Sequence, residues 1–340
     1  MSTKFKAWIS AARLRTLPLS ISGILVGSAY AYYSSLVNLR DVVFEGAESR
    51  EIMGYLIAHD TLIITLLALI TTLGFQVLSN FANDYGDGVK GTDNEDRVGP
   101  MRALQSGLIQ AHEMKRAMII TAVLTFISAI ALIYVSLGLD RLLISLFFLV
   151  LGIAAIWAAI KYTVGDNAYG YRGLGDVFVF IFFGPVSVMG IFYLITKSLD
   201  WSMILPSMTI GLLSVAVLNL NNMRDIQSDA KAGKNTIVVK MGLDTAKRFH
   251  YGLIYAAFLS ALIFIAVLYT NELAHADNLE RDGFMLFLLL PLLAFILLFA
   301  HLTTVRKTTT PALLDPELKK VALSTFAFAL LCLLSVCIAS

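Results

Sequence analysis

Long apolar runs dominate this sequence and restrict its fold more than any other feature. A run of about 20 apolar residues crosses the hydrocarbon core of a bilayer as one helix. Only 15% of the residues are charged, against about 25% in soluble domains. We therefore predict an all-α, polytopic membrane bundle in which residues 1–340 form a single integral-membrane domain. Nine transmembrane helices are expected, near 17–34, 61–82, 117–138, 141–161, 175–196, 203–222, 251–271, 284–302 and 321–339.

The segment before the first run predicts a short helix at the membrane surface. Residues 4–15 combine basic side chains with the apolar anchors Phe5, Trp8 and Ile9, as interfacial amphipathic helices do. A cleaved signal peptide is the alternative, because basic residues precede an apolar run that contains small residues. The length of this run, and the need of the later spans for membrane partners, favour a first helix that is retained.

The basic residues are divided unequally between the two sides of the predicted bundle. With the N-terminus inside, 21 Lys and Arg fall in cytoplasmic segments and five fall outside, which is the bias of a correctly oriented membrane protein. We expect a multi-pass protein of the cytoplasmic (inner) membrane, with its N-terminus in the cytoplasm and its C-terminus outside. The long polar loops 83–116 and 222–250 are then both cytoplasmic, and we expect the catalytic residues there.

Asn and Asp side chains gather at the ends of two predicted spans. Side chains three or four positions apart share one face of a helix. If the second span continues as a helix, one such face carries Asn80, Asn83, Asp84 and Asp87. At the end of the sixth span the positions i, i+3 and i+7 are Asn222, Asp225 and Asp229. Two helix ends thus present similar stripes of oxygen ligands on the cytoplasmic side.

The composition of these stripes indicates a particular kind of metal site. Clustered carboxylates repel one another unless a cation lies between them, and the negative end of the helix dipole already favours a cation. Oxygen ligands without His or Cys suit Mg²⁺, which substrate phosphates usually complete. The stripes therefore predict a magnesium and diphosphate site, and solvated helix ends are the alternative.

Basic side chains near the stripes support the same interpretation. Arginine binds phosphate oxygens in a bidentate manner. The alternative is that these residues only orient the protein in the membrane. The candidates for binding diphosphate are Arg97, Arg102, Lys161, Arg172, Arg224 and Lys234. The glycine and lysine spacing of a P-loop is absent from the sequence.

Several segments together resemble the UbiA superfamily of intramembrane aromatic prenyltransferases. Two Asp-rich motifs carry the resemblance to the superfamily, and the segments YGYRGLGD and GKNT resemble its naphthoate branch. The matching segments are RLRTLPLSISGILVGS at 13–28, NDYGDGVKGTD at 83–93, GPMR at 99–102, YTVG at 162–165, YGYRGLGD at 169–176, FFGPVSVMG at 182–190 and NNMRDIQSDAKAGKNTIVV at 221–239. The resemblance implies a bundle of nine spans around a central cavity, with a metal site at its cytoplasmic mouth.

The resemblance also implies roles for individual residues. Two Mg²⁺ ions would be bound by Asn83, Asp87, Asp225 and Asp229, with Asp84 and Asn222 as further ligands. Many members carry a third acid eight positions after the first Asn, where this chain has Gly91, so Asp93 takes the place of that ligand. Arg102, Lys161 and Lys234 would bind the diphosphate. Catalysis would depend on Asp87, Asp225, Lys161, Tyr162 and Tyr171, with both tyrosines facing the reactive carbon.

The activity implied by the naphthoate branch is a prenyl transfer. A polyprenyl group would pass from polyprenyl diphosphate to 1,4-dihydroxy-2-naphthoate, with loss of CO₂ and pyrophosphate, to give demethylmenaquinone in menaquinone biosynthesis. Membrane lipid is the expected environment, and no nucleic-acid partner is expected. One alternative is a UbiA-type prenyltransferase with another aromatic acceptor, such as hydroxybenzoate, homogentisate or haem. A distant alternative is an ion-coupled transporter, because acids within membrane segments often mark ion paths.

Overall fold

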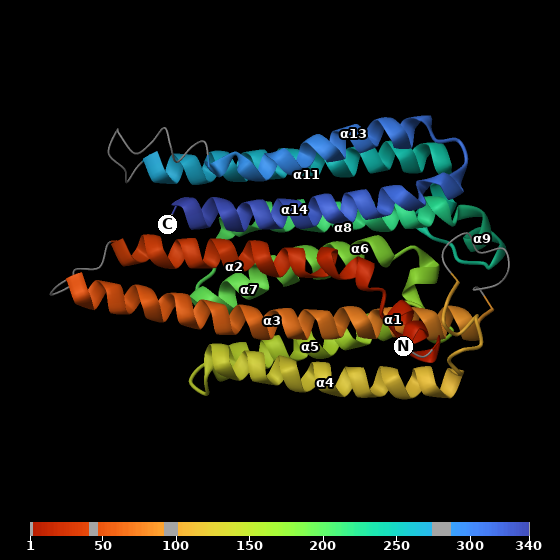
Figure 1. The fold of residues 1–340 in the computed structure, drawn as a ribbon, viewed down its shortest axis with the longest axis horizontal. Coiled ribbons are helices and arrows are strands. Elements are labelled where there is room, and N and C mark those ends of the chain that lie inside the picture. The colour runs from red at the N-terminus through yellow and green to blue at the C-terminus, as the bar shows by residue number, and fades with distance from the viewer. Residues whose placement is uncertain (1–2, 41–46, 92–100, 274–286, 340) are drawn as a thin grey trace.

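The chain folds into a bundle of long, roughly parallel helices (Figure 1). The structure, a computed structural model, describes residues 3–40, 47–91, 101–273 and 287–339. Within these ranges every regular element is helical, as predicted. The α-helices are α1 (Thr3–Ala12), α2 (Leu17–Arg40), α3 (Ala47–Val89), α4 (Ala111–Leu137), α5 (Leu142–Lys161), α6 (Gly175–Ile181), α7 (Ser187–Thr196), α8 (Ile204–Arg224), α9 (Ile226–Lys231), α10 (Ile237–Met241), α11 (Leu243–Leu273), α13 (Ala294–Lys307) and α14 (Asp315–Ala339).

The number of membrane spans agrees with the sequence prediction. Eight helical segments in the described part of the chain are long and apolar enough to cross a bilayer. A ninth is obtained if α1 and α2, which meet at a bend of 44°, are taken together. In Figure 1 α2 runs along the bundle beside the other spans, and the N- and C-terminal ends of the chain lie at opposite ends of the bundle.

One span contains a break in its helical hydrogen bonding. Helices α6 and α7 are joined by a π-helical turn, η3 (Phe182–Val186), which contains Pro185. Proline has no N–H to donate, and π turns accommodate such a defect inside a helix. At Gly184 a Cβ would lie 2.5 Å from the carbonyl oxygen of Ser207 in α8. The turn and the glycine together let this span approach α8 closely.

Several helices extend beyond the predicted spans. Helix α3 has 43 residues, about 65 Å at 1.5 Å per residue, which is twice the roughly 30 Å of a hydrocarbon core. It continues through the segment assigned to loop 83–116 as far as Val89. Helix α11 likewise begins within 222–250, at Leu243. The predicted loop boundaries were therefore wrong in part, because polar helix ends that project from the membrane carry no apolar signal.

The first helix packs on the bundle more closely than a surface anchor would. The Trp8 ring meets Phe81 of α3 edge to face, with 5.6 Å between centroids. Ile9 lines the central cavity, and only Phe5 of the three predicted anchors is exposed. Lys4 forms an ion pair with Glu113 of α4, 2.6 Å from Nζ to Oε1. Tertiary packing thus partly buries two of the side chains that sequence alone assigned to lipid.

Candidate functional site

A cavity of about 790 Å³ lies inside the bundle, within the range of ligand-binding sites. Its lining comes from α1 to α8, α14 and the connecting segments that carry Arg102, Tyr169 and Lys234, with no side chain from α11 or α13 among the described residues. Apolar side chains of α4, α5 and α6 cover much of its wall, including Leu132, Leu151 and Phe178. Polar side chains gather at the end where α3 and α8 terminate, which we call the polar end; it contains Asn83, Arg102, Tyr162, Asn221 and Arg224.

The first Asn/Asp stripe lies on α3 at the polar end, because the helix continues to Val89. Asn83, Asp84 and Asp87 all line the cavity, and both carboxylates are almost completely buried. Neutral groups hold these side chains in place. The Ala103 N–H donates to Asp84 Oδ2 at 3.2 Å, and the Tyr171 hydroxyl donates to Asp87 Oδ1 at 2.8 Å. The predicted shared face of α3 is therefore present.

The segment after α5 reaches this stripe through two close backbone approaches. Thr163 is fully buried and donates to the Ala82 carbonyl at 2.9 Å and to Asn83 Oδ1 at 3.3 Å. A Cβ at Gly86 would lie 2.6 Å from the Thr163 hydroxyl, and one at Gly170 would lie 2.6 Å from the Tyr162 carbonyl oxygen. Gly86 lets the segment 162–171 lie directly on the end of α3, and Gly170 lets that segment fold back closely on its own residue Tyr162.

The second stripe has a different environment. Asp225 lies at the junction of α8 and α9, and its carboxylate faces the side chain of its neighbour Arg224. Arg224 Nε lies 2.8 Å from Asp225 Oδ1 and Nη2 lies 2.5 Å from Oδ2. The same guanidinium donates to Asn221 Oδ1 at 2.8 Å and to Asp315 Oδ1 of α14 at 2.5 Å. Arg224 is thus held by two carboxylates and one amide.

Lys234 supplies positive charge between the two stripes. Its ammonium lies 3.7 Å from Asp229 Oδ1 and 5.6 Å from the centre of the Tyr171 ring, and it lines the cavity. Burial lowers the pKa of Lys234, but the charges of Asp87 and Asp229 more than offset this, so the pKa is raised overall. The side chain therefore stays charged and acts as a cation shared by the α3 and α9 carboxylates.

Other predicted site residues are distributed unevenly. Arg102 and Tyr162 line the cavity, and burial, reinforced by nearby carboxylates, raises the pKa of Tyr162 to about 12. Asn222 is buried, and its Oδ1 accepts no hydrogen bond from the described residues. Arg172 is exposed and donates to Asn167 Oδ1 at 2.5 Å, so it is not brought to the cavity. Asp93 and Arg97 lie outside the described residues.

Lys161 is also displaced from the predicted centre. It is the last residue of α5, and it is absent from the cavity lining within the described part of the chain. A Cβ at Gly165, which has a φ of +89°, would lie 3.3 Å from the Lys161 ammonium. This lysine therefore lies against the turn that follows α5.

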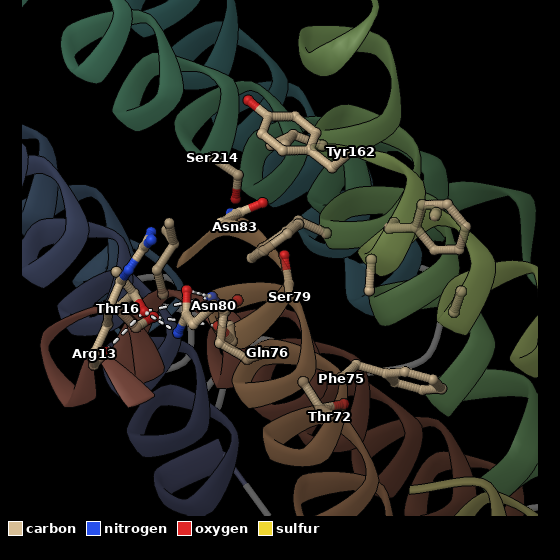
Figure 2. Close-up of a pocket in the computed structure, with 18 of the residues that line it drawn as sticks. Arg13, Thr16, Thr72, Phe75, Gln76, Ser79, Asn80, Asn83, Tyr162 and Ser214 are labelled. Carbon is tan, nitrogen blue, oxygen red and sulfur yellow. Dashed lines mark hydrogen bonds between the residues drawn. The ribbon is translucent and has the colours of Figure 1, made fainter. Parts of the chain in front are cut away.

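Sequence reasoning missed a polar network in the cavity wall beside the α1–α2 bend (Figure 2). Gln76 of α3 accepts from the Ser20 hydroxyl at 2.6 Å and donates to Asn80 Oδ1 at 3.2 Å. Asn80 donates to the Ala12 carbonyl at 2.9 Å and to the Thr16 hydroxyl at 3.4 Å. Spacing placed Asn80 on the stripe, but nothing in the sequence indicated that its partners come from the first 20 residues.

Comparison with known proteins identifies the family of the chain. The sequence model of a family described as "UbiA prenyltransferase family" matches residues 52–314. The chain belongs to the UbiA prenyltransferase family. This membership overturns the transporter alternative, and the aromatic prenyltransferase resemblance is confirmed.

Individual UbiA relatives cover most of the chain. The 1,4-dihydroxy-2-naphthoate octaprenyltransferase of Escherichia coli (strain K12) is 44% identical over 262 residues, which are 77% of each chain. The enzyme of the same name from Haemophilus influenzae is 40% identical over 88% of this chain and 87% of the relative. The one from Mycobacterium tuberculosis is 35% identical over 78% of this chain and 80% of the relative.

Solved structures show that the UbiA fold extends over nearly the whole chain. A UbiA homolog from Archaeoglobus fulgidus bound to DMAPP and Mg²⁺ superposes with a TM-score of 0.51 at 15% identity, covering 94% of this chain and 98% of that one. A structure described as a digeranylgeranylglyceryl phosphate synthase in membranes gives a TM-score of 0.52 at 15% identity and covers 98% and 99%. The multi-pass helical bundle is therefore the fold of this protein.

The UbiA site offers oxygen donors that fit a magnesium ion in part. No three His, Cys, Asp or Glu side chains converge on one position in the described ranges. Mg²⁺ commonly uses one or two carboxylates and takes its remaining ligands from water and substrate phosphates. The buried Asn222 oxygen that accepts no hydrogen bond and the buried carboxylates of Asp87 and Asp229 are donors of that type, and of these three residues Asp87 lines the cavity in the described part of the chain.

Proposed function

We propose that this prenyltransferase transfers a polyprenyl group from polyprenyl diphosphate to 1,4-dihydroxy-2-naphthoate. The products are demethylmenaquinol, which is the reduced form of demethylmenaquinone, CO₂ and pyrophosphate, in a step of menaquinone biosynthesis. Three relatives at 35–44% identity, each covered over more than two thirds of its length, are named for this acceptor. The observation that supports the chemistry is a buried lysine, Lys234, at the polar end of an apolar cavity, whose charge interacts with Asp87 of the first stripe and Asp229 of the second.

In this proposal the polar end of the cavity binds the diphosphate and two Mg²⁺ ions. Helix α3 contributes Asn83, Asp84 and Asp87, and the α8–α9 junction contributes Asn222, Asp225 and Asp229. Bound Mg²⁺ acts as a Lewis acid toward the leaving diphosphate. Lys234 and Arg102 add positive charge where negative charge develops, which favours departure of the diphosphate. Asp93 stays a predicted metal ligand, and Arg97 stays a predicted diphosphate-binding residue.

Aromatic side chains would stabilise the allylic cation that forms at the prenyl carbon when the diphosphate departs, and would shield it from water. Tyr162, Tyr169 and Phe178 line the cavity, and the Tyr169 and Phe178 rings stack with 4.1 Å between centroids. The faces of aromatic rings stabilise cations, and an apolar cavity excludes the water that would capture an allylic cation. The acceptor ring then attacks at the carbon that bears the carboxylate, and CO₂ leaves.

The proposal includes a location in the inner membrane with the polar end in the cytoplasm. The 21 to 5 division of basic residues supports it. Single cysteines can test the orientation, in a background where the exposed Cys337 is replaced by serine. His112→Cys, at the polar end, should react with an impermeant maleimide from the cytoplasmic side only. Ser198→Cys, in the exposed α7–α8 turn, should react only from outside, and the reverse pattern would refute the orientation.

Product analysis tests the reaction itself. Purified protein is incubated with Mg²⁺, octaprenyl diphosphate and dihydroxynaphthoate labelled with ¹³C in its carboxylate. We expect a prenylated quinol without the label, labelled CO₂, and loss of both products when EDTA removes the metal. Parallel reactions contain hydroxybenzoate, homogentisate or haem in place of the naphthoate. Turnover of one of these acceptors without turnover of the naphthoate would replace the proposal, and full turnover in EDTA would refute the magnesium assignment.

A further inference from the structure

The single positive charge of Arg224 is paired with two carboxylates. Its side chain is 1% exposed, and it contacts both Asp225 and Asp315. Asp225 is its sequence neighbour, whereas Asp315 comes from the first turn of α14, 91 residues away. Asp315 also lines the central cavity beside Arg224. A cationic side chain buried this completely requires a carboxylate partner, since removal of one partner of a buried pair is strongly destabilising.

The bond pattern of Asp225 conflicts with its proposed role as a metal ligand. Both of its carboxylate oxygens accept from Arg224, at 2.8 and 2.5 Å. A bond from Asp225 to Mg²⁺ would compete with this bidentate pair, because the metal and the guanidinium both draw on the negative charge of the same two oxygens. Arg224 Nη1 would remain paired with Asp315 after that change, because its 2.5 Å contact does not involve Asp225.

We propose that Asp315 is a positioning residue which holds Arg224 when Asp225 is transferred from the guanidinium to a magnesium ion. The inference rests on the proposed function, because it needs Asp225 as a magnesium ligand. With Asp315 present, the buried guanidinium keeps a full negative charge beside it in both states. Without Asp315, Asp225 is the only carboxylate that the described contacts give to Arg224, and magnesium has to compete for it.

A buried polar chain fixes the turn of α14 that carries Asp315. Glu317, two residues further on, is 3% exposed and its Oε2 lies 2.5 Å from His301 Nδ1 of α13. His301 Nε2 lies 2.8 Å from His250 Nε2 of α11, and Lys320 donates to the other Glu317 oxygen at 2.5 Å. These contacts join α11, α13 and α14 at the polar end. They fix the backbone of the α14 turn that carries Asp315.

Asp315→Asn provides the test, because asparagine keeps the shape and removes the charge. The matched control is Asp244→Asn, an exposed acid in the first turn of α11 that no described contact connects to the site. The probe is Mg²⁺, titrated in the presence of inorganic pyrophosphate, and the readout is calorimetric binding to the purified full-length protein. Prenyl transfer is measured over the same range of Mg²⁺ concentrations.

We expect Asp315→Asn to raise the Mg²⁺ concentration for half-saturation about 10-fold or more in both assays, while turnover at saturating Mg²⁺ stays within about 3-fold of the parent. Asp315→Glu should restore most of the affinity, and Asp244→Asn should leave it unchanged. An unchanged half-saturation in Asp315→Asn would overturn the inference and leave the proposed function intact. Absence of Mg²⁺-dependent pyrophosphate binding in the parent protein would overturn the magnesium site and, with it, the role of Asp315.

Discussion

The two Asn/Asp stripes look alike in sequence but differ in how the fold compensates their charge. On α3, Asp84 and Asp87 accept hydrogen bonds from a backbone N–H and a tyrosine hydroxyl, both neutral groups. At the α8–α9 junction, Asp225 is paired with Arg224 through both oxygens. Lys234 lies at the boundary, and the carboxylates of Asp87 and Asp229 both raise its pKa.

This difference indicates that the carboxylates of the two stripes have different partners before a cation binds. The hydrogen bonds described for the α3 carboxylates come from neutral donors, and Asp87 also shares the positive charge of Lys234 with Asp229. The carboxylate of Asp225 is already neutralised, so a cation gains it only in competition with an arginine. Two motifs of similar composition are therefore held by different kinds of partner, neutral hydrogen-bond donors on α3 and a guanidinium at the α8–α9 junction, and variants of the two should behave differently.

The largest expected effect comes from removing one carboxylate from each stripe. Asp87→Ala and Asp225→Ala should each reduce prenyl transfer at least about 1000-fold, because each removes a proposed metal ligand at the reacting diphosphate. Their effects on folding should differ. Asp225→Ala removes two charge-assisted hydrogen bonds from Arg224, which keeps Asp315, and should cost about 3 kcal/mol. Asp87→Ala removes one hydrogen bond from a neutral hydroxyl and the electrostatic attraction to Lys234, and should cost about 1 kcal/mol.

Turnover and thermal unfolding in detergent, both with and without Mg²⁺, measure these two effects. Equal losses of stability for the two variants would contradict the distinction between the stripes. Asp60→Ala, an exposed acid in the long α3 helix, serves as the control and should leave both quantities unchanged.

The lysine between the stripes should have the next largest effect. Lys234→Met removes the cation near Asp87 and Asp229, and we expect a loss of about 100-fold in kcat/KM for the prenyl diphosphate, the range of a preorganised electrostatic contact. The variant should also respond more strongly to Mg²⁺, since the metal then has to supply the positive charge that Lys234 gave to these carboxylates. Lys231→Met, an exposed lysine three residues away, is the control. A variant that keeps its activity and its Mg²⁺ dependence would refute the bridging role.

A smaller effect is expected at the hydroxyl that orients the α3 stripe. Tyr171→Phe removes the 2.8 Å hydrogen bond to Asp87 and keeps the ring beneath Lys90, whose ammonium lies 4.0 Å from the ring centre. One neutral hydrogen bond is worth about 0.5–1.5 kcal/mol, so turnover should fall about 3- to 10-fold. Tyr134→Phe, on the exposed face of α4, controls for loss of a hydroxyl. A loss as large as that of Asp87→Ala would mean that Tyr171 acts on substrate directly.

The smallest expected effect concerns pH. Burial, and then the charges of Asp176, Asp87 and Asp229 against that of Lys234, raise the pKa of Tyr162 to about 12. The phenol therefore stays protonated below that value and does not serve as a base near neutrality. The ratio of Tyr162→Phe turnover to parent turnover should stay constant from pH 6 to pH 9. A ratio that falls tenfold as the pH rises would show that a phenolate is used.

Most of the architecture followed from local patterns in the sequence. The apolar runs predicted the spans because a bilayer requires about 20 apolar residues in each helix. The i, i+3, i+4 and i+7 spacing of Asn80, Asn83, Asp84 and Asp87 predicted one shared face, since helical geometry alone sets it. Alternation of the spans across the membrane then brought both stripes to the same end. The segments 83–93 and 221–239 also carried enough of the family pattern to indicate the reaction class.

Only the tertiary structure determined how the charges pair. Asp315 reaches Arg224 across 91 residues, and the partners of Asn80 and Gln76 come from the α1–α2 bend. No repeat or spacing encodes such contacts, because they depend on how whole helices are rotated and packed against one another. The polar ends of α3 and α11 were missed for a related reason, since hydropathy describes the part of a helix in lipid and not the part beyond it. Sequence thus determined which residues reach the polar end, and packing determined which of them hold each other and which face the cavity.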